Sequence, residues 1–350
     1  MCEHKINQPK EKTVYLEVCR IIALFCIMYQ HTGGRGADAY LYTDSRWVYM
    51  MSLIGTIISR IGVPLFWMIS GELLLSKEEP WQKVYKKRIP RIAGALILFS
   101  VVRYLYLCIM DGQAGTVSEF AWKLYSREIF LPYWFLYAYL GILLVLPFIK
   151  RMIRNLTEQE EMVLFILILG WNILHDISKI FLNTDFVINL SVDNSICYFV
   201  LGYMMSNDKI LRKDEKRGLW LSIAAAVLVI GCVYLWTGYP VFGEIHGDAA
   251  EGCMVMPLTV SVYYMLRYIS NRGKCPITAI RHIILWCGGN VFGIYLIEDY
   301  LRNGTAVIWE KLAPHISAVP ACLIWLLVVF LIGNILVAGL RRLPLLRNIL

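Results

Sequence analysis

Charged residues are scarce in this sequence. Asp, Glu, Lys and Arg make up 17% of the 350 residues, whereas an average soluble domain carries about a quarter. Apolar residues reach 58%, and the mean hydropathy is +0.57. A soluble fold of this size does not bury so many apolar side chains. The composition therefore excludes an ordinary soluble domain and indicates a membrane protein.

Motifs typical of metal sites are also missing. The ten cysteines include no C-x-x-C pair, and the six histidines show no H-E-x-x-H or other ligand spacing. Most cysteines lie inside apolar stretches, which is typical of buried structural thiols. We therefore expect no metal. The sequence shows no internal repeat and no separate soluble domain, so we expect a single domain over residues 1–350.

Ten apolar segments follow one another along the chain. At a rise of about 1.5 Å per residue, about 20 residues cross a hydrocarbon core of roughly 30 Å. We expect an all-α, polytopic integral membrane bundle of about ten transmembrane helices, with nine to eleven as the range because some boundaries are ambiguous. The segments lie near residues 14–31, 47–75, 92–110, 129–149, 162–181, 187–206, 218–237, 252–270, 282–302 and 316–340.

Lysine and arginine are absent from residues 237–251 and concentrate in alternate loops. Positive residues in short loops mark the cytoplasmic side, so ten spans place both termini of the multi-pass chain in the cytoplasm. The spread of basic residues over six loops explains the net charge of +8 without a nucleic-acid partner. The basic positions include the N-terminus, the loops around Lys86, Arg151, Lys213 and Arg272, and Arg341, Arg342 and Arg347 at the C-terminus.

The first apolar segment contains ionisable residues, which are costly in lipid and are therefore functional candidates. Arg20 and His31 are eleven residues apart, which places them on nearly the same helix face, roughly 16 Å apart along the axis. Glu17 lies three residues before Arg20, so the two side chains can pair and lower the cost of burying charge.

Several short segments in order resemble the motifs of the acyltransferase 3 family of membrane acyltransferases. The run from Tyr15 to His31 matches the arginine, ten residues, histidine pattern of that family, with Glu17 in the usual Asp place. The other matching segments are residues 63–66 leading to Ser70 and Gly71, the Arg-x-x-Arg motif of Arg88 and Arg91, residues 134–137 and residues 293–297. The resemblance extends over nearly the whole chain.

One position departs from the family pattern. Family members often have His after the late Tyr-Leu-Ile segment, whereas this chain has Glu298 followed by Asp299. The role of that histidine therefore cannot be transferred to this chain. Glu298 lies near the outer end of the ninth expected span, where solvation of a helix terminus and a supporting role in acceptor binding are both open.

The resemblance implies a membrane O-acyltransferase of the inner (cytoplasmic) membrane that transfers an acyl group, expected to be acetyl, from cytoplasmic acyl coenzyme A to a hydroxyl of a cell-surface polysaccharide or lipid-linked saccharide. Acetyl coenzyme A is the expected donor. His31 would act as general base or as a transient acyl carrier, with Arg20 orienting the site. No cofactor is expected to stay bound. A structural hydrogen bond of His31, and a snorkelling Arg20 paired with Glu17, are the alternatives.

Arg88 and Arg91 are the expected donor-binding residues, because two guanidinium groups three residues apart can face one polyphosphate. An ordinary basic loop is the alternative. Ser70 could support the site, although a Ser-Gly pair in a span favours close helix packing. A membrane transporter of a small polar solute such as serine is the rival function, since buried charges also suit a permeation path.

Overall fold

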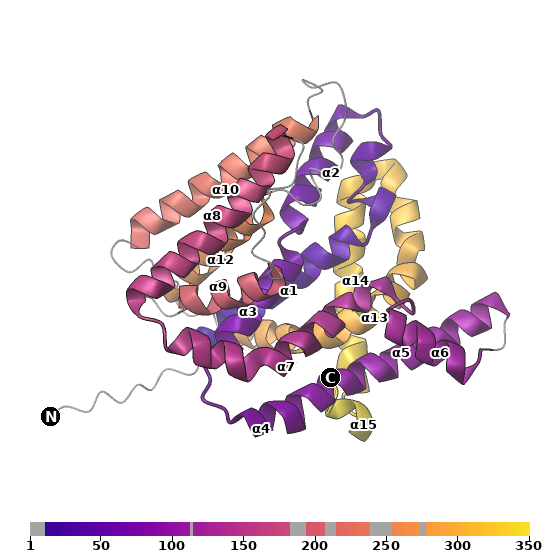
Figure 1. The fold of residues 1–350 in the computed structure, drawn as a ribbon. Coiled ribbons are helices and arrows are strands. Elements are labelled where there is room, and N and C mark those ends of the chain that lie inside the picture. Colours follow the sequence, from indigo (N-terminus) through magenta and orange to yellow (C-terminus); the bar gives the residue numbers. More distant parts are fainter. Residues whose placement is uncertain (1–10, 113–114, 183–193, 207–214, 239–253, 273–277) are drawn as a thin grey trace. The chain divides into compact units, whose positions relative to one another are not determined.

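The computed structural model describes residues 11–112, 115–182, 194–206, 215–238, 254–272 and 278–350. Over these residues the chain is helical and contains no strand (Figure 1). This agrees with the all-α class expected from the apolar segments. The contacts divide the chain into two compact units, one of Met1–Ser76 with Thr157–Asn334 and the other of Lys77–Leu156 with Ile335–Leu350.

The first unit contains the N-terminal helices and most of the later ones. Its helices are α1 (Glu11–Gln30), α2 (Arg46–Ser59), α3 (Gly62–Leu75), α8 (Glu158–Leu182), α9 (Asn194–Ser206), α10 (Glu215–Gly238), α12 (Val255–Arg272), α13 (Thr278–Ile316) and the first part of α14 (Ala318–Leu340).

The second unit contains the segment between α3 and α8 and the end of the chain. Its elements are α4 (Trp81–Lys83), a π-helical turn (Val84–Arg88), α5 (Ile89–Asp111), α6 (Val117–Ser126), α7 (Trp134–Arg154), the end of α14 and α15 (Pro344–Arg347). A single domain over residues 1–350 stays a prediction.

Seven stretches of the described residues are long and apolar enough to cross a membrane, and each corresponds to one expected segment. They are Arg46–Leu75, Trp81–Met110, Leu131–Arg154, Glu158–Ser178, Lys216–Thr237, Thr278–Ile316 and Ala318–Leu340. The segment 14–31 is helical as α1 up to Gln30, and 252–270 is helical as α12 from Val255 onward, while residues 252–253 and part of 187–206 lie outside the described residues. The chain is thus a multi-pass helical membrane protein, while the count of ten and the side of the termini stay predictions.

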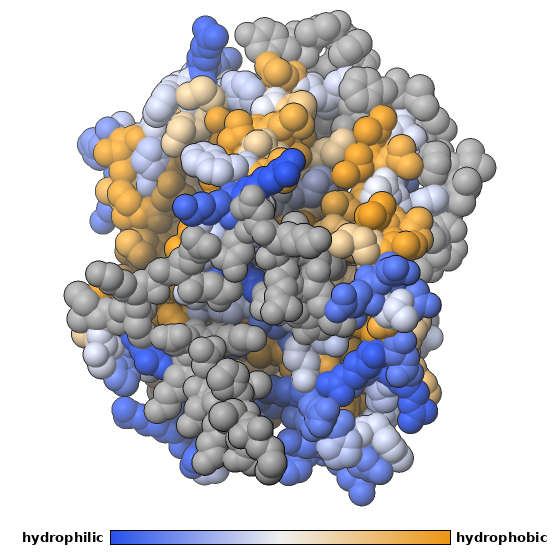
Figure 2. Space-filling view, turned by 90° about the vertical axis from the view of Figure 1, so that its left-hand side faces the viewer, coloured by the Kyte–Doolittle hydropathy of each residue, from blue (hydrophilic) through white to orange (hydrophobic). Residues whose placement is uncertain are grey.

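Large apolar side chains remain exposed on the long helices, as lipid-facing surfaces require. Figure 2 shows such side chains over a broad part of one face, with hydrophilic side chains gathered toward its lower end. Exposed examples on α10 and α14 are Trp220, Leu221, Val227, Leu228, Leu323, Leu327 and Leu331.

The expected segment 47–75 consists of two helices rather than one. α2 ends at Ser59 and α3 begins at Gly62. Pro64 lies in the first turn of α3, and proline has no N–H to bond the carbonyl of the residue four positions earlier, which is Arg60. The proline therefore explains why the helix is interrupted at this point. Gly62 also lies against α1, where a Cβ would meet the main-chain oxygen of Ala23 at 3.0 Å.

The helix α3 packs closely on α9 through a pair of glycines. A Cβ at Gly71 would lie 1.7 Å from the main-chain oxygen of Phe199, and one at Gly202 would lie 2.0 Å from that of Met68. Neither position has room for a side chain. The close packing expected of the Ser70–Gly71 pair is therefore confirmed, with Gly71 as the contact residue.

The helix α13 is longer than the expected segment 282–302. It is 39 residues long in total and ends at Ile316. At 1.5 Å per residue its length is roughly 58 Å, which exceeds the thickness of a hydrocarbon core of about 30 Å. It packs along α1, because a Cβ at Gly288 would lie 2.4 Å from Glu17 Oε2. Residues near 298 are therefore in the middle of a helix and not at its end.

Candidate active site

His31 follows directly after α1, where the chain leaves the helix. Its N–H still donates to the carbonyl of Ile27 at 3.1 Å, and the Thr32 hydroxyl donates to the carbonyl of Tyr29 at 2.6 Å. Gly33 has a φ of 53°, a left-handed conformation that glycine adopts without steric cost. These features end the helix and place the imidazole of His31 beyond its last turn.

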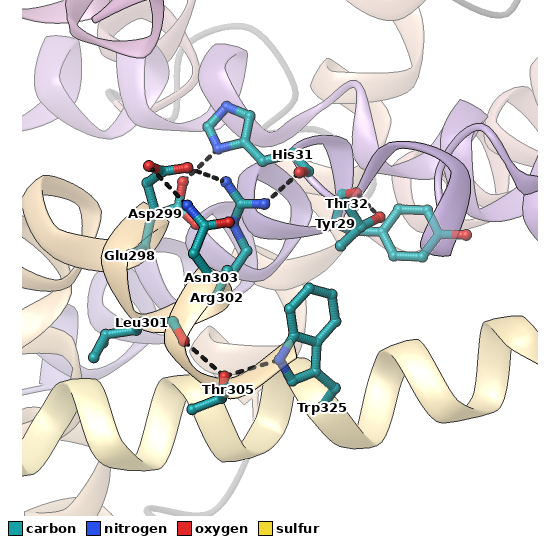
Figure 3. A network of polar contacts seen from close by, with 10 residues as sticks. All are labelled: Tyr29, His31, Thr32, Glu298, Asp299, Leu301, Arg302, Asn303, Thr305 and Trp325. Carbon is teal, nitrogen blue, oxygen red and sulfur yellow. Dashed lines mark hydrogen bonds and ion pairs between the residues drawn. The ribbon is translucent and has the colours of Figure 1, made fainter. Parts of the chain in front are cut away.

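The imidazole of His31 contacts the carboxylate of Glu298 in the middle of α13. The distance from His31 Nδ1 to Glu298 Oε1 is 2.5 Å (Figure 3). The Glu298 side chain is 2% exposed, whereas that of His31 is 26% exposed. The pair therefore has a buried member that holds position and a partly open member that a second molecule can reach.

Arg302 links both members of this pair. Its Nε donates to Glu298 Oε2 at 2.6 Å, and another guanidinium nitrogen donates to the main-chain oxygen of His31 at 2.5 Å. A third nitrogen donates to Asp299 Oδ1 at 3.0 Å (Figure 3). We call His31, Glu298, Asp299 and Arg302 the His31 cluster. Within it, the buried negative charge of Glu298 is balanced by a hydrogen-bonded guanidinium, as buried charges require.

The arrangement determines how the imidazole can react. An ionised carboxylate only accepts hydrogen bonds, so it selects the tautomer of His31 with the proton on Nδ1. The lone pair is then on Nε2, which is the nitrogen able to take a proton from a hydroxyl or to attack a carbonyl. A carboxylate at Nδ1 also stabilises the imidazolium that forms.

Two readings of Glu298 were open from the sequence, and the structure contradicts one of them, while a supporting role in acceptor binding stays a prediction. Solvation of a helix terminus is wrong for this residue, because α13 continues to Ile316 and Glu298 is buried. Asp299 is beside it and half-buried, with its carboxylate on Arg302. The residue that stands in place of the family's usual histidine therefore faces His31 itself.

Arg20 and Glu17 form the expected ion pair within α1. Arg20 Nη1 is 2.5 Å from Glu17 Oε1. Glu17 is buried, and its other oxygen lies against Gly288 of α13. Among the described contacts none joins Arg20 to the His31 cluster. The pairing is thus confirmed, while a role for Arg20 in the reaction stays a prediction.

A second buried polar cluster joins α1 to two other helices. The hydroxyls of Tyr15 on α1 and Tyr263 on α12 both donate to Oε2 of Glu72 on α3. All three side chains are buried. We call them the Glu72 cluster. Nothing in the local sequence predicts that two phenols from distant helices meet Glu72.

The two arginines of the Arg-x-x-Arg motif have different partners in the second unit. Arg88 donates to Glu79 Oε2 from two nitrogens, at 3.0 and 2.7 Å. Arg91 donates to the main-chain oxygens of Ile349 and Leu350, at 3.1 and 2.9 Å. The structure therefore does not direct both guanidinium groups at one point, although the sequence spacing allows it.

Glu79 shows the electrostatic effect of this pairing. Burial works to raise the pKa of its carboxyl, but hydrogen bonds from Arg88 and Lys83 outweigh burial and hold that pKa below its ordinary value. Glu79 is therefore ionised at neutral pH, and it forms an ion pair with the guanidinium of Arg88.

Ser70 is half-buried on α3, and the described hydrogen bonds do not connect it with His31. Arg302 is the member of the His31 cluster that sequence reasoning missed. Its signal was local, because Arg302 follows Glu298 by four residues and Asp299 by three, spacings that bring side chains together on a helix. No group of three or more His, Cys, Asp or Glu able to hold a metal occurs within the described part of the chain.

Comparisons with known proteins identify the family of the chain. No curated protein and no solved structure matches the chain. The family model of acyltransferase 3, described as an acyltransferase domain, matches residues 13–340. The matched range contains α1 from residue 13 onward, the positions of the His31 cluster and the Arg-x-x-Arg motif. The chain is a multi-pass membrane protein that belongs to the acyltransferase 3 family.

Proposed function

We propose that the protein is a membrane O-acyltransferase whose general base is His31. The observation that carries the proposal is the contact of His31 Nδ1 with the buried carboxylate of Glu298, in a chain of an acyltransferase family. This contact selects the reactive tautomer and leaves a partly exposed imidazole. Arg302 is a positioning residue, because it holds both Glu298 and the main chain of His31.

The reaction follows from the chemistry of the imidazole. His31 Nε2 removes the proton of an acceptor hydroxyl, and the oxygen attacks the thioester carbonyl of the donor. The carbon–sulfur bond then breaks, and the leaving thiolate takes the proton from the imidazolium. Glu298 stabilises the imidazolium while the charge is present. Attack by Nε2 itself, which forms an acyl-histidine that the hydroxyl then cleaves, uses the same geometry.

The finer identity of the substrates comes from the resemblance. We propose acetyl coenzyme A as a donor from the cytoplasm and a hydroxyl of a cell-surface polysaccharide or lipid-linked saccharide as acceptor, with both termini cytoplasmic in an inner membrane. The donor acts as a co-substrate, and no permanently bound cofactor is proposed. Family membership does not favour the alternative, transport of a small polar solute.

A direct test measures acetyl transfer by the purified full chain in lipid nanodiscs, with labelled acetyl coenzyme A and a lipid-linked saccharide extract. His31→Ala should lower transfer by about 10³-fold, the usual contribution of a general base. The matched control is His315→Ala, which removes an exposed histidine of the same helix as Glu298. Equal activity of the two variants contradicts the assignment of His31.

The same preparation separates the two routes. Rapid denaturation at neutral pH during turnover should recover label on the chain only if an acyl-histidine forms, because acyl-imidazoles hydrolyse quickly in acid, and His31→Ala should remove that label. A well-folded wild-type protein that transfers no acetyl group and neither binds nor cleaves any acyl coenzyme A contradicts the acyltransferase proposal as a whole.

A further inference from the structure

The loop that follows His31 is held in place by buried hydroxyl groups of α2. The Ser52 hydroxyl donates to the main-chain oxygen of Gly36 at 2.6 Å, and the Thr56 hydroxyl donates to that of Ala37 at 2.5 Å. Ser52 and Thr56 are 0% and 1% exposed. A buried hydrogen bond of this kind is costly to lose, because its partner is left without water. These contacts therefore fix the backbone that carries the residues after His31.

Arg35 lies on this loop, and its guanidinium lies over two indole rings. Arg35 Cζ is 5.7 Å from the centroid of the Trp309 ring and 5.7 Å from that of the Trp325 ring. Both distances are within the range of a cation–π interaction. An indole offers an electron-rich face but no conventional hydrogen-bond acceptor. The two rings therefore orient the guanidinium without using its N–H groups.

A single carboxylate is hydrogen-bonded to Arg35 among the described residues. Arg35 Nη2 is 3.5 Å from Glu310 Oε1, and the two side chains are 38% and 56% exposed. This distance is at the long limit of a hydrogen bond, and an exposed ion pair contributes little. The guanidinium is thus oriented by its surroundings, while its charge is only weakly compensated and most of its donors are open to a ligand.

The indole of Trp325 also connects this arginine with the His31 cluster. Trp325 Nε1 donates to the Thr305 hydroxyl at 2.9 Å (Figure 3). Thr305 follows Arg302 by three residues on α13, and Arg302 donates to the main-chain oxygen of His31. Along the chain, the four residues from His31 to Arg35 span at most about 14 Å. A short oligosaccharide is long enough to reach both residues.

We propose that Arg35 binds an oxyanion of the acceptor and thereby selects anionic acceptors for transfer at His31. A guanidinium forms bidentate, charge-assisted hydrogen bonds with a carboxylate or a phosphate. The anion can come from the carboxylate of an acidic sugar or from the diphosphate that joins a saccharide to its lipid, and it replaces the weak contact with Glu310. The inference rests on the proposed function for the identity of the acceptor, whereas anion binding at Arg35 is measurable without acyl transfer.

The test measures binding of defined probes to the full chain in phosphatidylcholine nanodiscs. An oligosaccharide of glucuronic acid is compared with one of glucose of the same length, and farnesyl diphosphate is compared with farnesol. Arg35→Gln should weaken binding of one anionic probe about tenfold, as expected for loss of a charge-assisted contact, and that probe identifies the source of the anion. The matched control is Arg46→Gln, at an exposed arginine at the start of α2, which should change affinity less than twofold.

Two further variants test the site without removing the charge of Arg35. Glu310→Gln removes the competing carboxylate from an exposed position, so it should tighten binding of the same anionic probe two- to threefold. Arg35→Lys keeps the charge but not the planar fork, and it should weaken binding less than Arg35→Gln does. In transfer assays, Arg35→Gln should raise KM for the anionic acceptor more than it lowers kcat.

Two results would overturn the site. Wild-type protein could bind neither anionic probe more tightly than its neutral counterpart, or Arg35→Gln could equal Arg46→Gln for both anionic probes. Acetyl transfer that depends on His31 in the same samples would leave the proposed function standing in that case. Anion binding that depends on Arg35 in a protein without acetyl transfer would support the anion site and contradict the proposed function.

Discussion

The His31 cluster and the Glu72 cluster use similar groups for different ends. Each centres on a buried carboxylate that is hydrogen-bonded by a side chain far away in the sequence, Glu72 by Tyr263 and Glu298 by His31. All members of the Glu72 cluster are buried, whereas the imidazole of His31 is 26% exposed. A buried polar network becomes a candidate site when one reactive member stays accessible, and otherwise it serves to hold helices together.

The largest effect is expected for Glu298→Gln, which tests whether the His31 cluster differs from the Glu72 cluster by being reactive. An amide cannot stabilise an imidazolium as a carboxylate does, so acetyl transfer should fall by roughly 10²- to 10⁴-fold while the fold persists. The measurement is the initial rate against pH, together with the thermal unfolding midpoint. Glu298→His introduces the residue common in the family and should also be inactive, because His31 and Arg302 lose the carboxylate that they share. Wild-type rates in either variant would contradict the role of Glu298.

Arg302→Ala should lower both the stability of the fold and the acetyl-transfer activity. It leaves the carboxylate of Glu298 buried without its guanidinium, which costs about 3–5 kcal/mol of unfolding free energy. Arg302→Lys keeps the positive charge but not the three-way contact, and it should recover stability more than activity. Chemical denaturation and transfer assays on the two variants would show whether stability and activity separate as expected.

Glu72→Ala tests the fully buried Glu72 cluster. It leaves the hydroxyls of Tyr15 and Tyr263 buried without their acceptor, which should lower the unfolding free energy by about 3 kcal/mol. Glu72→Gln retains an acceptor oxygen and should recover most of the loss. The transfer rate per folded molecule should stay close to wild type, and a rate that falls as much as for Glu298→Gln would remove the distinction between the clusters.

Gly71→Ala extends the test to the helix that holds Glu72. The added methyl group overlaps the main-chain oxygen of Phe199, and such overpacking costs typically about 1–3 kcal/mol. Gly94→Ala is the control, since a Cβ there meets nothing within 4 Å. Unfolding midpoints that shift equally in both variants would argue against close packing of α3 and α9.

The smallest effect is expected at the partly buried pairing of Glu79. The pKa of its carboxyl is lowered by Arg88 and Lys83, so its stabilisation is present above its ordinary pKa near 4.5 and is lost as pH falls through the lowered value. Glu79→Gln should therefore cost about 1 kcal/mol at pH 7 and progressively less as the pH is lowered toward 3. Unfolding curves at the two pH values check the sign.

Local features of this molecule were predictable from its sequence. The Glu17–Arg20 pair depends on a spacing of three residues in one helix, and the apolar segments depend on composition. Pro64 in the expected span 47–75 is likewise a local feature, and it explains the interruption between α2 and α3. These features need no knowledge of tertiary structure.

Contacts between distant residues were not predictable. His31 and Glu298 are 267 positions apart, and Tyr263 and Glu72 are 191 apart. Periodicity defines which face of a helix is polar but not which helix packs against it. For the same reason, the sequence indicated Arg88 as the partner of Arg91, while the structure pairs Arg91 in space with Arg341.

The two contacts between α1 and α13 also bear on how the chain threads the bilayer. Glu17 lies beside Gly288, and His31 lies beside Glu298, so residue numbers rise in the same direction along both helices. If each helix spans the membrane, parallel helices of one chain must be separated by an odd number of crossings. The beginnings of α1 and α13 then face the same compartment, whatever the total number of spans.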